Sequence, residues 1–256
     1  LGGAKNHMLV LPDADLDLAA DAAVSAGFGS AGERCMAISV VLAVDPIGDE
    51  LVDRIAARVA GITVGPGDDP ESQMGPLITA EHRDRVAAYL DLGVAEGAKL
   101  VVDGRRTPIR GGGTAADTPG FWLGPSVLDQ VPVGSRVHRE EIFGPVLAIV
   151  RVPSYEAGLR IINEGEYGNG TAVFTNDGGA ARRFQNEVEV GMVGINVPIP
   201  VPAAYYGFGG WKASLFGDTH VYGTEGVHFY TRQKVVTARW LDPSHGGVHL
   251  GFPAGG

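Results

Sequence analysis

Strand-like and helix-like segments alternate along almost the whole chain, and this alternation is the strongest constraint on its fold. Short runs rich in branched apolar residues predict buried strands. They cover 8–11, 37–44, 98–104, 121–128, 146–152, 171–175 and 191–196. Longer segments with apolar side chains on one face predict helices. They cover 16–24 (capped by Asp15), 49–62, 80–97, 154–164 and 177–188. This order favours an α/β fold with a largely parallel sheet covered by helices.

Charge and cysteine content exclude several classes of protein. Thirty acidic against twenty basic residues give a formal net charge of −10, which argues against a general surface for nucleic acid or anionic membranes. No apolar run approaches the roughly 18 residues of a transmembrane helix. The single cysteine excludes an internal disulfide and fits a reducing compartment. We therefore expect a cytoplasmic protein, or a mitochondrial matrix protein in a eukaryote, that contacts neither nucleic acid nor membrane.

The single cysteine, Cys35, lies in the glycine-rich stretch "GSAGERCMAIS" (29–39), directly after Arg34. A free cysteine is usually a small buried hydrophobic residue. The neighbouring arginine favours a second interpretation, a nucleophile whose substrate carries negative charge. The glycines then read as a flexible approach to the thiol. The seven histidines are scattered without zinc-site spacing, so we expect no metal, and no phosphate-binding fingerprint is present.

Five short motifs occur in an order that is known from one enzyme family. They are "LGGAKNH" (1–7), "GSAGERCMA" (29–37), "QMGPLIT" (73–79), "EEIFGPV" (140–146) and "GFGGWKAS" (207–214). In this order they resemble the NAD(P)-dependent aldehyde dehydrogenase superfamily, from Leu1 to about Trp240. The variants "GGAKNH" and "GERCMA", with "YGTEGVHFYTRQKVVTARW" (222–240), resemble its CoA-acylating methylmalonate-semialdehyde dehydrogenase branch.

The resemblance implies a division of the chain into three parts. Residues 1–214 would form the nucleophile-bearing catalytic domain. Residues 215–242 would form a return helix and an oligomerisation strand, since 226–240 ends in a β-rich stretch, and 243–256 would be a flexible tail. The NAD-binding domain of the family would lie upstream and outside this chain. A homodimer or homotetramer is implied for the full-length protein.

The same resemblance implies a role for each candidate site residue. Cys35 matches the nucleophile, which adds to an aldehyde and carries a thioester after oxidation. Arg34 matches an arginine that holds the substrate carboxylate; the alternative is a pair with Glu33 or another acid. Glu141 matches the glutamate that binds the nicotinamide ribose, and Phe143 the phenylalanine beside the nicotinamide. Alternatively, Glu141 is a surface acid and Phe143 a core residue.

These residues predict oxidation of methylmalonate or malonate semialdehyde to propionyl- or acetyl-CoA, with NAD as cofactor and coenzyme A as co-substrate. By resemblance, the reaction belongs to valine, pyrimidine or inositol breakdown. One alternative is a hydrolytic aldehyde dehydrogenase that gives a free acid. Its general base would precede the L-G-G motif, a position that lies before Leu1. Another alternative is a non-catalytic assembly fragment, whose β-rich end pairs with other subunits.

Overall fold

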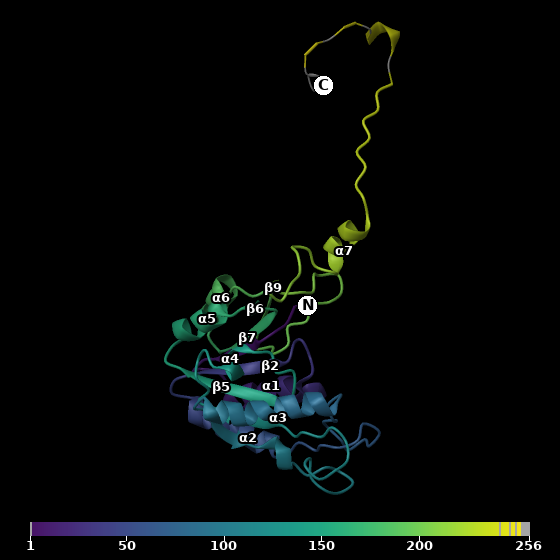
Figure 1. Ribbon diagram of the computed structural model, residues 1–256. Helices are drawn as coiled ribbons and strands as arrows, with labels where there is room; N and C mark the ends of the chain where they lie inside the picture. Colours follow the sequence, from purple (N-terminus) through teal and green to yellow (C-terminus); the bar gives the residue numbers. More distant parts are fainter. Residues whose placement is uncertain (1, 241, 246, 249, 252–256) are drawn as a thin grey trace.

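The computed structural model describes residues 2–240, 242–245, 247–248 and 250–251, and its central element is a seven-stranded sheet (Figure 1). The strand order is β3–β4–β5–β2–β1–β7–β8. The strands are β1 Asn6–Val10, β2 Ile38–Val44, β3 Lys99–Val102, β4 Ser126–Asp129, β5 Val146–Val152, β7 Gly170–Phe174 and β8 Met192–Ile195. All neighbours are parallel except the antiparallel pair β3–β4. The predicted α/β fold with a largely parallel sheet is confirmed.

Helices cover both faces of this sheet. One core contains residues of α1 (Leu16–Phe28) and α2 (Gly48–Val59), and the other contains residues of α3 (Ala80–Ala95), α5 (Tyr155–Glu164) and α6 (Gly178–Glu187). Side chains of a strand point alternately to the two faces. In β1, Met8 and Val10 therefore enter the first core and Leu9 the second. Asp15 caps α1 as predicted, accepting hydrogen bonds from two backbone N–H groups of its first turn.

Two segments differ from the sequence-based prediction. The strand predicted over 121–128 forms only at its end, as β4, because the apolar side chains of Trp122 and Leu123 are buried within a loop rather than in the sheet. The loop predicted over 105–120 is not fully exposed, since Ile109 and Ala115 are buried in the first core. Apolar content alone does not distinguish a strand from a buried loop.

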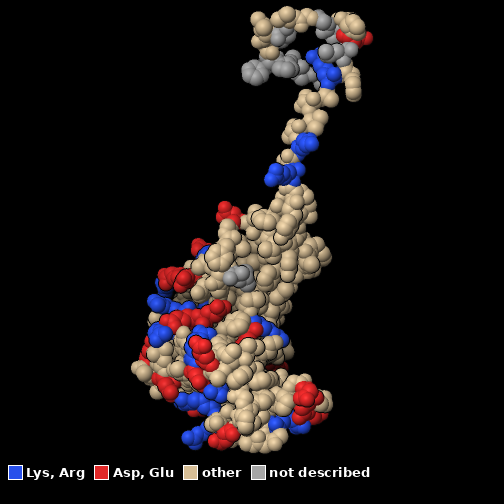
Figure 2. All heavy atoms as spheres, turned by 45° about the vertical axis from the view of Figure 1, so that its right-hand side comes forward, with Lys and Arg blue, Asp and Glu red and all other residues tan. Residues whose placement is uncertain are grey.

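The C-terminal part projects from the sheet. After the short antiparallel pair β6 (Tyr167–Gly168) and β9 (Trp211–Lys212), helix α7 (Gly223–Tyr230) buries none of its residues. Residues 231–240 extend away from the body and form no strand, unlike the predicted β-rich end, because a strand requires a neighbour with which to pair (Figure 1). Figure 2 shows that the surface around α7 carries few charges. Half of the predicted flexible tail, 243–256, lies outside the described residues.

Within the described residues, no helix is both long enough and apolar enough to cross a membrane.

A pair of buried histidines joins β1 to the short helix α4 (Arg136–Arg139). The backbone N–H of Gly134 donates to Nδ1 of His138 at 3.3 Å, which places the proton of the neutral ring on Nε2. That Nε2 lies 3.3 Å from Nε2 of His7, and His7 also makes a backbone hydrogen bond to Lys5. Burial lowers the pKa of His7 to about 3 and that of His138 to about 4. Both rings are therefore neutral at physiological pH.

This pair predicts a loss of stability in mild acid. The unfolded chain binds protons at both imidazoles below about pH 6.5, whereas the folded chain does not until about pH 4 or below, so the free energy of unfolding falls as pH drops through this window. Each histidine adds a slope of up to about 1.4 kcal/mol per pH unit. Urea unfolding between pH 7 and 4 measures it. His138→Phe is expected to reduce this slope. The control His228→Gln, in the exposed helix α7, is expected to leave it unchanged. Equal slopes in the unmodified chain and both variants would contradict the role of the buried pair.

Candidate active site

Cys35 lies just after a tight turn that joins α1 to β2. Ser30, Ala31 and Gly32 adopt left-handed backbone conformations in succession, with φ values of 53°, 54° and 71°. A Cβ atom on Gly32 would lie 2.3 Å from the carbonyl oxygen of Gly144, so only glycine fits there. Two non-glycine residues at positive φ store backbone strain of about 1–3 kcal/mol each. The turn is therefore closely packed and strained, not the flexible approach that its glycines predict.

Two buried asparagines fix the backbone at Cys35. Its carbonyl oxygen accepts hydrogen bonds from Nδ2 of Asn6 and Nδ2 of Asn169, both at 2.9 Å. Asn6 also donates to the carbonyl oxygen of Ala37 and accepts from the N–H of Gly170. The nucleophile candidate is thus bonded to the start of β1 and to the segment before β7. Asn6 belongs to the motif "LGGAKNH", whereas nothing in the sequence singled out Asn169.

The four predicted site residues line one small hollow. Cys35, Arg34, Glu141 and Phe143 share it with five others: Ala4, Asn6, Gly32, Ala37 and Ser39. Parallel strands bring these segments together, because the residues preceding β1, β2 and β5 meet at the same edge of the sheet. The hollow encloses only about 10 Å³, room for about one water molecule at most. The hollow therefore does not enclose a space the size of an organic substrate.

Arg34 is exposed and has no acidic partner within the described residues. Its Nε donates to Oγ of Ser30 at 3.0 Å, and its guanidinium lies across Gly29, where a Cβ atom would be 2.7 Å from Nη1. The carboxylate of Glu33 instead faces Nε2 of His82 at 3.2 Å. The alternative interpretation, an Arg34–Glu33 ion pair, is therefore wrong. The guanidinium keeps its outer nitrogens available for an anion.

Glu141 and Phe143 approach the hollow from the segment before β5. Oε1 of Glu141 accepts a hydrogen bond from the N–H of Ala4 at 3.0 Å, which holds the carboxylate at the start of β1. Phe143 has φ 61° and is 37% exposed as a residue, so it is not a core residue. The neighbouring Glu140 turns away to Arg136 and Tyr89, which hold the pKa of its carboxyl down at about 2.

His82 on α3 connects the two sides of the hollow, and sequence reasoning missed it. Its Nε2 lies 3.2 Å from Oε1 of Glu33 and 2.7 Å from the carbonyl oxygen of Phe143. Arg85, one turn later, approaches Nδ1 of His82 at 3.0 Å and donates to the carbonyl oxygen of Ile142. Burial raises the pKa of Glu33, and the neighbouring His82 partly opposes this. The sequence signals only the start of a helix at this place.

The donor set fits an organic cofactor better than a metal. Within the described residues no group of three histidine, cysteine or acidic side chains could hold a metal ion. Glu141 bonds Ala4 through one oxygen, which leaves the other to accept hydrogen bonds from a diol such as a ribose. The exposed ring of Phe143, on the same hollow, offers a flat apolar surface to an aromatic ring.

A cysteine that follows a strained turn thus lies beside a carboxylate at one edge of a largely parallel sheet. The profile of the aldehyde dehydrogenase family matches residues 1–236. The chain belongs to the aldehyde dehydrogenase family, as the order of its motifs predicted.

Individual relatives narrow the comparison. A malonate-semialdehyde dehydrogenase of Pseudomonas aeruginosa is 52% identical over 99% of this chain and 50% of its own length. The methylmalonate-semialdehyde dehydrogenase of Oceanimonas doudoroffii superposes with a TM-score of 0.90 at 48% identity, over 95% of this chain and 49% of its own. A Staphylococcus aureus betaine aldehyde dehydrogenase solved with NAD+ has a TM-score of 0.81 at 35% identity. The match covers 89% of this chain and 44% of that enzyme's chain. The chain spans about half the length of the curated relatives it matches.

Proposed function

We propose that this chain is the nucleophile-bearing part of an NAD-dependent, CoA-acylating dehydrogenase of malonate or methylmalonate semialdehyde. The observation that carries the proposal is the shared hollow, in which Cys35 lies beside a carboxylate and an arginine that has no acidic partner among the described residues. The semialdehyde dehydrogenases of Pseudomonas aeruginosa and Oceanimonas doudoroffii support it at 52% and 48% identity. In this proposal residues 1–214 are the catalytic domain, and the nucleotide-binding domain is supplied by the half of the relatives that this chain does not match.

The reaction begins when the Cys35 thiolate adds to the aldehyde carbon and forms a thiohemiacetal. Arg34 holds the substrate carboxylate, and the N–H of Cys35 is a donor for the developing oxyanion. A bound NAD would supply the acceptor for the hydride of the thiohemiacetal carbon, and Cys35 would then carry the thioester. Glu141 orients the nicotinamide ribose through its second carboxylate oxygen. The substrate carboxylate leaves as CO2, the α-carbon that carried it takes up a proton, and the coenzyme A thiol takes the acyl group and frees Cys35.

The test uses a hybrid enzyme, which joins this chain to the half of the Pseudomonas aeruginosa relative that the chain does not match. With malonate semialdehyde and NAD+, we expect sustained NADH formation only when coenzyme A is present, together with acetyl-CoA as product. Equal NADH formation without coenzyme A, with a free acid as product, would instead identify a hydrolytic enzyme. The Pseudomonas aeruginosa relative itself, measured in parallel, controls for the assay.

Self-association belongs to the same proposal. The segment 231–240 is exposed and unpaired, and the surface around α7 is apolar, with Tyr205, Phe216 and Phe229 all exposed (Figure 2). In the proposed homodimer or homotetramer this segment adds a strand to another subunit. The single cysteine forms no internal disulfide and fits a reducing compartment, so in this proposal the enzyme acts in the cytoplasm.

A further inference from the structure

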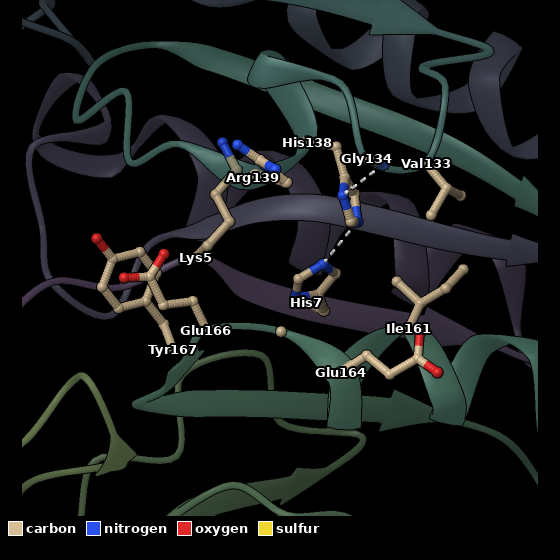
Figure 3. A pocket seen from close by; sticks show the side chains of 11 residues that line it. Lys5, His7, Val133, Gly134, His138, Arg139, Ile161, Glu164, Glu166 and Tyr167 are labelled. Carbon is tan, nitrogen blue, oxygen red and sulfur yellow. Dashed lines mark hydrogen bonds between the residues drawn. The ribbon is translucent and has the colours of Figure 1, made fainter.

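A second cavity lies behind the candidate active site, on the other face of β1. It has a volume of about 430 Å³, a size typical of small-molecule sites (Figure 3). Side chains of successive residues at the start of β1 point to opposite sides. Ala4 and Asn6 line the hollow at Cys35, whereas Lys5 and His7 line this second cavity. One stretch of backbone therefore separates the two.

The histidines in this cavity are not its binding groups. Figure 3 shows the hydrogen-bonded chain from Gly134 through His138 to His7. The ring nitrogens that make these hydrogen bonds are already occupied as donors or acceptors. Both rings are neutral at physiological pH. The two histidines form an uncharged polar wall of the cavity. The ring nitrogens in these hydrogen bonds are therefore not available to a metal ion or a charged ligand.

Lys5 has unused hydrogen-bonding capacity in this cavity. Only 6% of the residue is exposed, yet within the described part of the chain its ammonium group has one acceptor, the carbonyl oxygen of Glu140 at 2.7 Å. An ammonium group has three donors, which leaves two for a ligand. Arg139 lines the same cavity and makes no ion pair with a described residue. A buried ammonium beside an unpaired guanidinium is an arrangement that an anion stabilises.

We propose that this cavity is an anion-binding site, in which Lys5 and Arg139 hold the carboxylate or phosphate group of a small metabolite. The remainder of the ligand contacts the apolar side chains of Val133 and Ile161 and the ring of Tyr167. Glu164 and Glu166 also line the cavity, but both are exposed, so solvent screens their repulsion.

The site is connected to the candidate active site through two hydrogen bonds. Nζ of Lys5 binds the carbonyl oxygen of Glu140, and the N–H of Ala4 binds the carboxylate of Glu141. An anion bound by the two remaining donors of Lys5 pulls on the same ammonium group that holds the Glu140 carbonyl. Occupancy of the cavity therefore alters the restraint on the backbone that presents Glu141.

Ligand binding at Lys5 is expected to depend on pH. Burial lowers the pKa of Lys5 to about 7, against the opposing charges of Glu141 and Glu140. The neighbouring His7 and His138 stay neutral above about pH 5, and Arg139 keeps its charge throughout. Only the protonated amine attracts an anion, so affinity is expected to be about tenfold weaker at pH 8 than at pH 6.

The experiment is an NMR titration of the 256-residue chain with sodium sulfate and with sodium acetate, at constant ionic strength set by sodium chloride. Neither probe titrates between pH 6 and 8; sulfate has the tetrahedral geometry of phosphate and acetate is a carboxylate. We expect saturable shifts of the amides of Gly134 and Gly165, which line the cavity. Tighter sulfate binding identifies a phosphate group as the ligand chemistry, and tighter acetate binding identifies a carboxylate.

Three variants decide the assignment. Lys5→Met and Arg139→Gln are each expected to weaken binding at least about tenfold, because each removes a charge-assisted hydrogen bond. Arg182→Gln, an equally exposed arginine on α6 outside the cavity, is the matched control and is expected to bind as the unmodified chain does. Arg139 is exposed, so its variant tests the site even if Lys5→Met fails to fold. Absence of saturable shifts, or unchanged affinity in Arg139→Gln, would overturn the proposal. The experiment needs no dehydrogenase activity, so it is independent of the proposed function.

Discussion

Replacing Cys35 by alanine is expected to abolish turnover of the hybrid enzyme and to leave its fold intact. The substitution removes the sulfur that forms the thioester, and no other cysteine exists in this chain to replace it. A loss of at least about 10³-fold in kcat is expected when a covalent nucleophile is removed. The fold is spared because Asn6 and Asn169 bind the backbone carbonyl of residue 35, which alanine retains. NADH absorbance measures turnover, and circular dichroism with thermal unfolding measures the fold.

The matched control for this variant is Ser39→Ala, which removes one heteroatom from the lining of the same hollow. It is expected to keep kcat within about threefold, as is usual for a residue that does not take part in the chemistry. Iodoacetamide gives a second readout, because a chain with one thiol takes one label and the Cys35→Ala variant takes none. A Cys35→Ala enzyme that retained more than a tenth of the activity would exclude the nucleophile assignment.

The sequence predicted the sheet and its helices because each element carries a local signal of its own. The run Ile38–Val44 is apolar on both faces, as a central strand must be, and Asp15 signals the start of α1 through local hydrogen bonds. Prediction failed where burial depends on distant partners. Trp122 and Ile109 are apolar loop residues that pack under other segments, and residues 231–240 have strand-like composition but no strand beside them.

The candidate site was predictable only in part, for the same reason. Motif order placed Cys35, Arg34, Glu141 and Phe143 in one functional unit, and the structure brings all four to one hollow. Their supports could not be read from the sequence. His82 contacts two segments that lie far from it along the chain, and its position is set by α3 as a whole. Spacing along the chain does not reveal such contacts.

Arg34→Leu is expected to raise the KM for malonate semialdehyde about 100-fold in the hybrid enzyme. The arginine's Nε is bonded to Ser30, and its outer nitrogens have no acidic partner among the described residues, so the carboxylate of the substrate is the anion that they can bind. Charge-assisted hydrogen bonds contribute about 1.5–3 kcal/mol each, which corresponds to roughly 10- to 150-fold in affinity. Propionaldehyde has no carboxylate, so its KM is expected to change by less than about threefold.

The comparison between the two substrates is what makes the experiment decisive. A structural role for Arg34 would disturb the turn before Cys35 and slow both aldehydes alike, whereas carboxylate recognition affects only the charged one. Arg34→Lys separates charge from geometry, because an ammonium group attracts the carboxylate but cannot bind both of its oxygens with a planar fork. Its KM for the semialdehyde is expected to lie between those of the unmodified enzyme and Arg34→Leu. An equal rise of KM for both substrates would show that Arg34 supports the turn and that another residue selects the acid.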